Sequence, residues 1–149
     1  MPALESQRIG TATDSEHVWP EGHWDWPIEL PYKHGVKRGN LIFVGGQVAM
    51  DDQGNVLHPG NVVKQTALAM ENIEKVLSGF GATLGDVVKL NRFYVGQGTR
   101  EDWELGARVA ASYFEEPGPA ATGIPVPALA YEGLMVEIEV IAIVEAVAP

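Results

Sequence analysis

Two glutamates near the C-terminus, Glu137 and Glu139, alternate with apolar residues in the stretch from Leu134 to Val144. Successive side chains of a β-strand point to opposite faces, so both carboxylates lie on the face opposite the apolar side chains. If that face borders a dry interface, desolvation and mutual repulsion raise at least one carboxyl pKa toward the range of a general base or acid. The alternative is a solvated strand face that carries two ordinary glutamates.

Two further polar residues, Tyr32 and Arg92, are candidates for binding a ligand. The phenol of Tyr32 could donate a hydrogen bond to an anionic or carbonyl group, or its ring could pack at an interface. Arg92 lies in a predicted strand with Asn91 and Tyr94, and a strand cation is seldom buried without a partner. A salt bridge to one of the many surface acids is the alternative role for Arg92.

The chain has four histidines and no cysteine. The absence of cysteine excludes thiolate catalysis and disulfides, and no two histidines have the H-x-x-x-H spacing of a helical zinc site, so we expect no metal. His23 and His34 could act as acid–base groups, and Trp24 and Trp26 could stack on a planar ligand, if the segment that carries them folds over the site. Solvated loop histidines and tryptophans packed at an interface are the alternatives.

Hydrophobic periodicity predicts the elements that position these residues. Residues 1–31 are rich in Trp and Pro and predict an irregular arm, followed by a domain over 32–149. The domain pattern predicts strands near 36 and over 40–50, a helix from the cap Asn61 to 80, a strand over 86–95, a helix from the cap Thr99 to 114, an edge strand among the prolines of 117–127, and a central strand over 134–144. The fold class is α+β in the order ββ-α-β-α-ββ, a mixed sheet with two helices on one face and the other face in need of a partner.

Composition limits the function. The 149 residues suit one domain, and the net charge of −10 disfavours binding to nucleic acid. The first residues lack the apolar core of a signal peptide, and the longest apolar stretches, 41–48 and 140–144, are too short to span a bilayer. We therefore expect a cytoplasmic protein with no membrane segment.

Several blocks in the same order resemble the Rid (reactive intermediate deaminase) superfamily, formerly labelled endoribonuclease L-PSP. The resemblance covers about residues 31–145, and its order and spacing are more specific than any single block. The blocks are Leu41-Ile-Phe-Val-Gly-Gly-Gln47, Gln65-Thr66 with Met70-Glu-Asn-Ile-Glu74, Gly81-Ala82 with Asp86-Val-Val-Lys89, Pro119-Ala120, and Val136-Glu-Ile-Glu-Val-Ile-Ala142.

The resemblance implies a chorismate-mutase-like fold that assembles as a homotrimer, with three sheets facing inward and a small-molecule pocket at each subunit interface. It also implies hydrolysis of imines or enamines with release of ammonia and without a metal or organic cofactor. Carried over by position, the acid that positions water is Glu137, the pocket tyrosine is Tyr32, and the turn that lines the site is Gly45-Gly46.

One departure from the family pattern concerns the arginine that grips a substrate carboxylate. The family's Pro-Ala-Arg-Ser is here Pro119-Ala120-Ala121-Thr122, followed by Gly123 where many members have Cys. Loss of a bidentate pair between arginine and carboxylate typically costs about 2 to 5 kcal/mol. We assign Ala121, Thr122 and Gly123 to the substrate-binding region and nominate Arg92 to replace the missing cation.

Three functions follow as hypotheses. The first is a cofactor-free Rid-type hydrolase that acts on a small imine, enamine or related C–N compound other than a simple 2-imino acid. The second is a non-catalytic trimer that binds a small ligand as a sensor or scavenger. The third, a ribonuclease, is disfavoured by the negative charge and by the lack of paired histidines.

Overall fold

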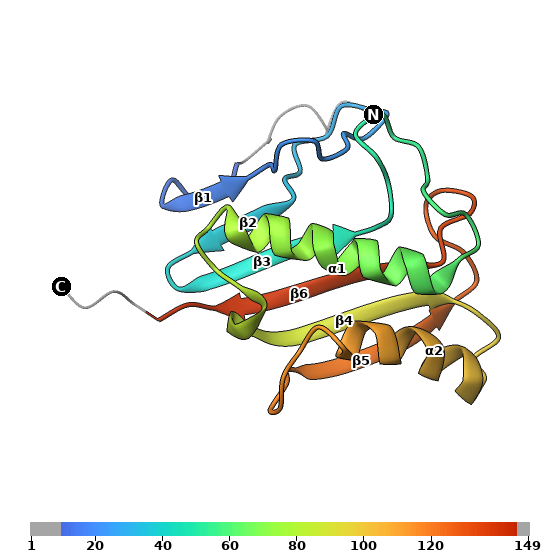
Figure 1. The fold of residues 1–149 in the computed structure, drawn as a ribbon. Coiled ribbons are helices and arrows are strands. Elements are labelled where there is room, and N and C mark those ends of the chain that lie inside the picture. Colours follow the sequence, from blue (N-terminus) through green and yellow to red (C-terminus); the bar gives the residue numbers. More distant parts are fainter. Residues whose placement is uncertain (1–9, 146–149) are drawn as a thin grey trace, which may run out of the picture.

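The computed structural model describes residues 10–145 as one mixed, six-stranded sheet with both α-helices on the same face (Figure 1). The elements in chain order are β1 (Ser15–Val18), β2 (Gly35–Arg38), β3 (Leu41–Gln47), α1 (Val62–Ser78), the 3-10 helix η2 (Leu84–Asp86), β4 (Val87–Val95), α2 (Arg100–Ala111), β5 (Ala120–Val126) and β6 (Val136–Ile143). The strand order is β1-β2-β3-β6-β4-β5, and β4 pairs with β5 in parallel while the other neighbours pair antiparallel. The predicted α+β class and the order ββ-α-β-α-ββ are confirmed from β2 onward.

Both helices begin at the caps that the sequence predicts. The Asn61 side chain accepts a hydrogen bond from the Lys64 backbone N–H at 3.0 Å, and the Thr99 hydroxyl accepts one from the Asp102 backbone N–H at 3.2 Å. Each cap satisfies a backbone donor that the first turn of a helix leaves free. The chain therefore leaves the sheet and enters each helix at a fixed residue.

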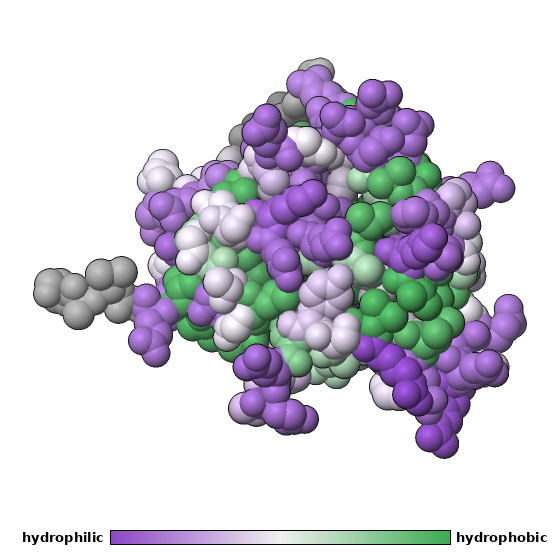
Figure 2. Space-filling view, in the orientation of Figure 1, coloured by the Kyte–Doolittle hydropathy of each residue, from purple (hydrophilic) through white to green (hydrophobic). Residues whose placement is uncertain are grey.

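Strand β6 lies in the centre of the sheet and divides it into two different faces. Its side chains Val136, Ile138 and Ala142 are fully buried beneath the helices. The opposite face has no covering element within residues 10–145, and Leu41, Phe43 and Ile143 are exposed there. Viewed from the helix side, the surface is largely hydrophilic with hydrophobic areas between (Figure 2).

The segment before β2 is more ordered than the predicted irregular arm. Ser15–Val18 form β1, which adds to the sheet edge by antiparallel pairing with β2. The sequence of this short strand has no clear apolar alternation, so periodicity does not predict that it pairs with the sheet. Trp24 is buried in a small second core with Val48, Met50 and Leu134, so it packs within the chain and is not free to cover a ligand.

A buried network of neutral imidazoles holds this segment against β3. The His23 Nε2–H donates to Gln47 Oε1 at 2.9 Å, Gln47 Nε2 donates to His34 Nδ1 at 3.3 Å, and His34 Nε2–H donates to the Trp24 carbonyl at 3.0 Å. The Trp26 ring stacks on His34 with centroids 5.2 Å apart. A proton added to the acceptor Nδ1 of His34 would set two donors against each other, so the network requires neutral His34.

This network predicts a loss of stability in mild acid. Burial, the largest cause, lowers the pKa of His23 to about 4, and burial also lowers the pKa of His34. Because the unfolded chain takes up these protons first, the stabilisation is complete above the ordinary histidine pKa near 6.5 and declines as the pH falls toward 4. We expect His23 alone to account for up to ~3 kcal/mol of that decline, measured by urea unfolding at pH 7.5 and at pH 4 to 5. His23→Gln should flatten the dependence, and an equal slope in that variant would contradict the assignment.

Candidate functional site

The carboxyl group of Glu137 lies on the uncovered face of the sheet, between β3 and β4. Because Val136 and Ile138 pack into the core, Glu137 points to this face, where it lies opposite Phe93 of β4. The side chain is half-buried. Burial, and secondly the negative charge of Glu139, raise the pKa of Glu137 above the ordinary glutamate value. This carboxyl group is therefore a stronger base than a solvated glutamate.

Gly46 of β3 gives the Glu137 side chain its space. The register between β3 and β6 shifts between Val44 and Gln47, which places Gly46 against the carboxyl group. A Cβ atom on Gly46 would lie only 2.7 Å from both Cδ and Oε1 of Glu137, whereas one on Gly45 would keep 3.6 Å from its nearest neighbour, the His34 carbonyl oxygen. Of the two predicted glycines, the structure therefore places Gly46 against Glu137, and Gly45 lines the neighbouring hollow with Glu139.

Glu139 has a different partner on the same face. The amide of Asn91 donates to Glu139 Oε1 at 3.2 Å, and both residues line a shallow hollow of about 260 Å³ with Phe43, Gly45 and Ile141. The predicted pairing of two acids on one face is confirmed by the alternating exposure of β6. The two acids differ in that the Asn91 amide holds the Glu139 carboxylate, and the negative charge of Glu139 raises the pKa of Glu137.

Tyr32 and the two histidines lie outside this arrangement within the chain. The Tyr32 side chain is 60% exposed, and its ring meets the edge of Trp26 at 6.2 Å between centroids. His23 and His34 are buried in the network with Gln47, and they are neither solvated nor free to serve as acid–base groups. Their burial depends on Trp24, which adjoins His23 in the sequence, and on Gln47, which lies 24 residues from His23 and 13 from His34.

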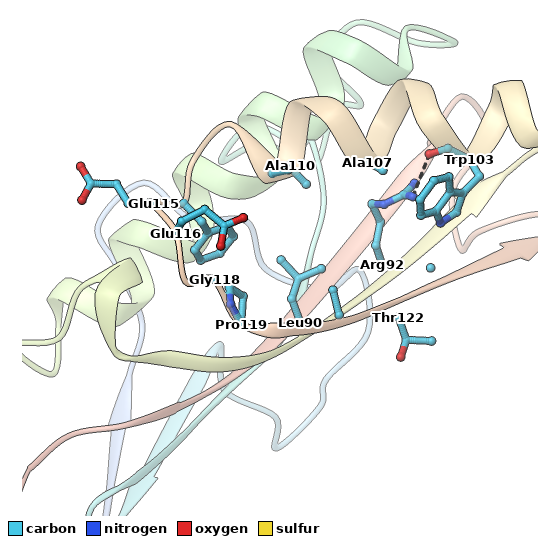
Figure 3. Close-up of a pocket in the computed structure, with 14 residues that line it drawn as sticks. Leu90, Arg92, Trp103, Ala107, Ala110, Glu115, Glu116, Gly118, Pro119 and Thr122 are labelled. Atoms are coloured by element: carbon cyan, nitrogen blue, oxygen red, sulfur yellow. Dashed lines mark hydrogen bonds between the residues drawn. The ribbon is translucent and has the colours of Figure 1, made fainter.

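A second concave region lies between α2 and the edge strand β5, on the helix side of the sheet (Figure 3). Its volume is about 350 Å³. Arg92 and Trp103 stand at one end, and Glu115 and Glu116 at the other (Figure 3). The predicted binding residues Arg92, Ala121, Thr122 and Gly123 all line this pocket.

Glu137 and Arg92 point to opposite faces of the sheet. Arg92 pairs with Ile138, which belongs to the helix-covered face, and Phe93 pairs with Glu137. The residues that we predicted as a single site therefore form two regions in this chain, Glu137 with Gly45 and Gly46 on one face and Arg92 with Ala121 and Gly123 on the other. Thr122 borders the pocket, but its residue pairs with Asn91 and its hydroxyl accepts a hydrogen bond from Lys89 Nζ at 2.7 Å, so its side chain points away from Arg92.

Several lining residues of the α2–β5 pocket were not predicted as site residues. They are Trp103, Ala107, Ala110, Ala111 and Phe114 of α2 and the turn that follows. The sequence carries a signal for them, because alanines at positions 107, 110 and 111 on the inner stripe of a helix fill little space.

Neither a metal centre nor a membrane span is seen in the described part of the chain. Residues 10–145 contain no cluster of three acidic or histidine side chains arranged to hold a metal ion. No helix in this range is long and apolar enough to cross a bilayer.

Comparison with known proteins identifies the family. The sequence model described as Endoribonuclease L-PSP matches residues 27–144. The chain is 32% identical over 105 residues to "3-aminoacrylate deaminase RutC" of Acinetobacter baylyi, covering 70% of this chain and 79% of that protein. It is also 32% identical over 113 residues to "2-iminobutanoate/2-iminopropanoate deaminase" of Mus musculus, covering 76% and 81%. The crystal structure of RidA from an Antarctic Psychrobacter species superposes with a TM-score of 0.74 at 26% identity, covering 87% and 99%.

The chain therefore belongs to the Endoribonuclease L-PSP family, the Rid superfamily that includes the RutC proteins. The predicted membership and the α+β Rid fold are both confirmed. The relatives are named as deaminases of imino and enamine acids.

The influence of Glu139 on Glu137 can be measured directly. In Glu139→Gln we expect the pKa of Glu137 to fall, because the repelling charge is gone, yet to stay above the ordinary value, because burial is the larger cause. Side-chain carboxyl NMR titration of labelled glutamates gives both values. A Glu137 pKa that is unchanged in this variant would contradict the charge coupling between the two acids.

Proposed function

We propose that the protein is a cofactor-free hydrolase of the Rid type, which deaminates a small imine, enamine or related C–N compound other than a simple 2-imino acid. The observation that carries the proposal is the half-buried Glu137 carboxyl group with its raised pKa, facing Gly46 on the open sheet face. The family and the names of its relatives support the reaction class.

Glu137 can serve the proton transfers of such a reaction. Its carboxylate takes a proton from water as the water oxygen bonds to the carbon of the protonated C=N group, which gives a neutral carbinolamine. It then passes that proton to nitrogen, and as the C–N bond breaks it takes the proton of the hydroxyl group, so that the carbonyl forms and ammonia leaves. An enamine enters the same sequence after protonation on carbon. Such proton transfers by a positioned side chain contribute on the order of 10²- to 10⁴-fold in rate.

Assembly as a homotrimer belongs to the same proposal. Leu41, Phe43 and Ile143 are between 38% and 46% exposed on the sheet face that the helices leave open. Contiguous exposed apolar side chains on one face are typical of an interaction surface. A second copy on this face would exclude water from Glu137 and would bring an exposed Tyr32 toward a neighbour's site. A cytoplasmic location stays a prediction.

The proposed exclusion of simple 2-imino acids rests on the sequence of β5. Ala121 occupies the family's arginine position, and the cation nominated to replace it, Arg92, faces away from Glu137 of the same chain. A simple 2-imino acid carries its carboxylate one bond from the reacting carbon, so these two residues of one chain cannot engage both groups together. Recovery of a bound ligand chemically unchanged would instead support the non-catalytic binding protein.

Removal of the acid tests the hydrolase directly. With a panel of imines and enamines generated in situ and ammonia release as the readout, we expect Glu137→Gln to lower turnover by about 10²- to 10⁴-fold, because the amide cannot take up the proton. Glu71→Gln, the same change at an exposed position of α1, is the matched control and should keep full activity. Full ammonia release by Glu137→Gln would exclude the proposed role.

A charge on the open face tests the assembly. Phe43→Asp should convert trimers to monomers, because three buried carboxylates would meet without partners. Val63→Asp on α1, where the side chain is similarly exposed, should leave the trimer intact. Light scattering coupled to size exclusion gives the masses. A wild-type monomer, or a Phe43→Asp trimer, would contradict the proposed assembly.

A further inference from the structure

Arg92 is a buried cation without a compensating charge among residues 10–145. Its side chain is only 3% exposed beneath α2. The guanidinium group lies 4.7 Å from the Tyr94 ring centroid, and none of the ion pairs of the described chain includes it. A buried charge in this state is costly unless something outside the chain compensates it.

Most of the hydrogen-bonding capacity of Arg92 is also unused. Of its five N–H donors, a hydrogen on Nη2 is donated to the Trp103 carbonyl at 3.1 Å, and the buried Nη1 has no partner. The Trp103 carbonyl lies inside α2, where helical hydrogen bonding already satisfies it. The single bond from Arg92 is therefore not required by the helix, and the guanidinium remains available to an acceptor.

Two N–H donors converge above Gly123. A Cβ atom on Gly123 would lie 3.0 Å from Arg92 Nη2 and 2.9 Å from Trp103 Nε1. Glycine leaves that point free of side-chain atoms, at hydrogen-bond distance from both nitrogens. An oxygen atom placed there would accept from a cation and from an indole at once.

The rest of the pocket selects what could carry that oxygen. Next to the two donors lies an apolar space formed by Leu90, Ala107, Ala110 and Ala111. Its volume of about 350 Å³ is in the range of small-ligand sites. The carboxylate of Glu116 at the far end disfavours a second negative charge on the same ligand, whereas the Glu115 side chain points away from the pocket (Figure 3).

We propose that the α2–β5 pocket binds a small monocarboxylate, whose oxygens accept from Arg92 and Trp103 above Gly123 and whose apolar body lies against the alanines of α2. The pocket is separate from Glu137 in this chain. The inference goes beyond the proposed hydrolysis, does not depend on it, and can fail while that function stands.

Benzoate is a suitable probe, with benzamide as its uncharged isostere. By calorimetry on the full chain, we expect saturable benzoate binding and an affinity for benzamide at least tenfold lower. The indole N–H signal of Trp103, assigned with Trp103→Phe, should shift as benzoate is added. Glu137→Gln should bind benzoate as the wild type does. Equal affinity for benzoate and benzamide, or no benzoate binding at 50 mM, would overturn the proposal.

Arg92→Met separates a binding role from a structural one. The variant should lose at least tenfold in benzoate affinity, and its melting temperature without benzoate should rise, because an uncompensated buried charge is replaced by an apolar side chain. Arg108→Met removes an exposed cation from α2, the helix that lines the pocket, and should leave benzoate affinity within twofold. Unchanged affinity in Arg92→Met, or a lower melting temperature, would count against the assignment.

A second variant keeps the test valid should Arg92→Met fail to fold. Ala121→Phe acts on the exposed edge strand and fills the pocket while Arg92 remains in place. We expect it to fold and to lose at least tenfold in benzoate affinity, and retained affinity would refute the proposed location.

Discussion

The alternation of side chains along β6 is the constraint on which the rest of the structure depends. Val136, Ile138 and Val140 are at most 2% exposed beneath the helices, and the residues between them therefore face the other way. Both neighbours, β3 and β4, pair with β6 antiparallel and fix its register from two sides. A slip of one residue would bury Glu137 and Glu139 under α1, so core packing itself directs the acids to the open face.

Glu137 and Arg92 are both desolvated, and they lie on opposite sides of that sheet. Burial raises the pKa of Glu137 and lowers the pKa of Arg92, which is the direction that desolvation imposes on an acid and on a base. Neither group is needed to hold the fold, because an apolar side chain at either position would avoid the cost of burying charge. Such groups are typical of functional sites.

The buried histidine network connects the N-terminal segment to the acid. Gln47 joins His23 to His34 and also donates to the Gly45 carbonyl at 3.1 Å. The adjacent residue, Gly46, makes the close approach to Glu137. The segment that precedes β2 thus helps to hold the turn against which the Glu137 carboxyl group packs.

The sequence by itself determined the family, both helix caps, the order of elements from β2 onward and the face that carries Glu137. The caps and the face of Glu137 depend on residues a few positions apart in the sequence. The family depends on the order and spacing of several blocks, which a single sequence shows. Only the tertiary structure decided that β1 pairs with the sheet, that His23 and His34 are buried, and that Arg92 lies near Gly123 without an ion-pair partner among residues 10–145. The environment of each of these groups is formed by residues distant in sequence, such as Gln47 for the histidines and Trp103 for Arg92, and no local pattern specifies which distant side chains will meet.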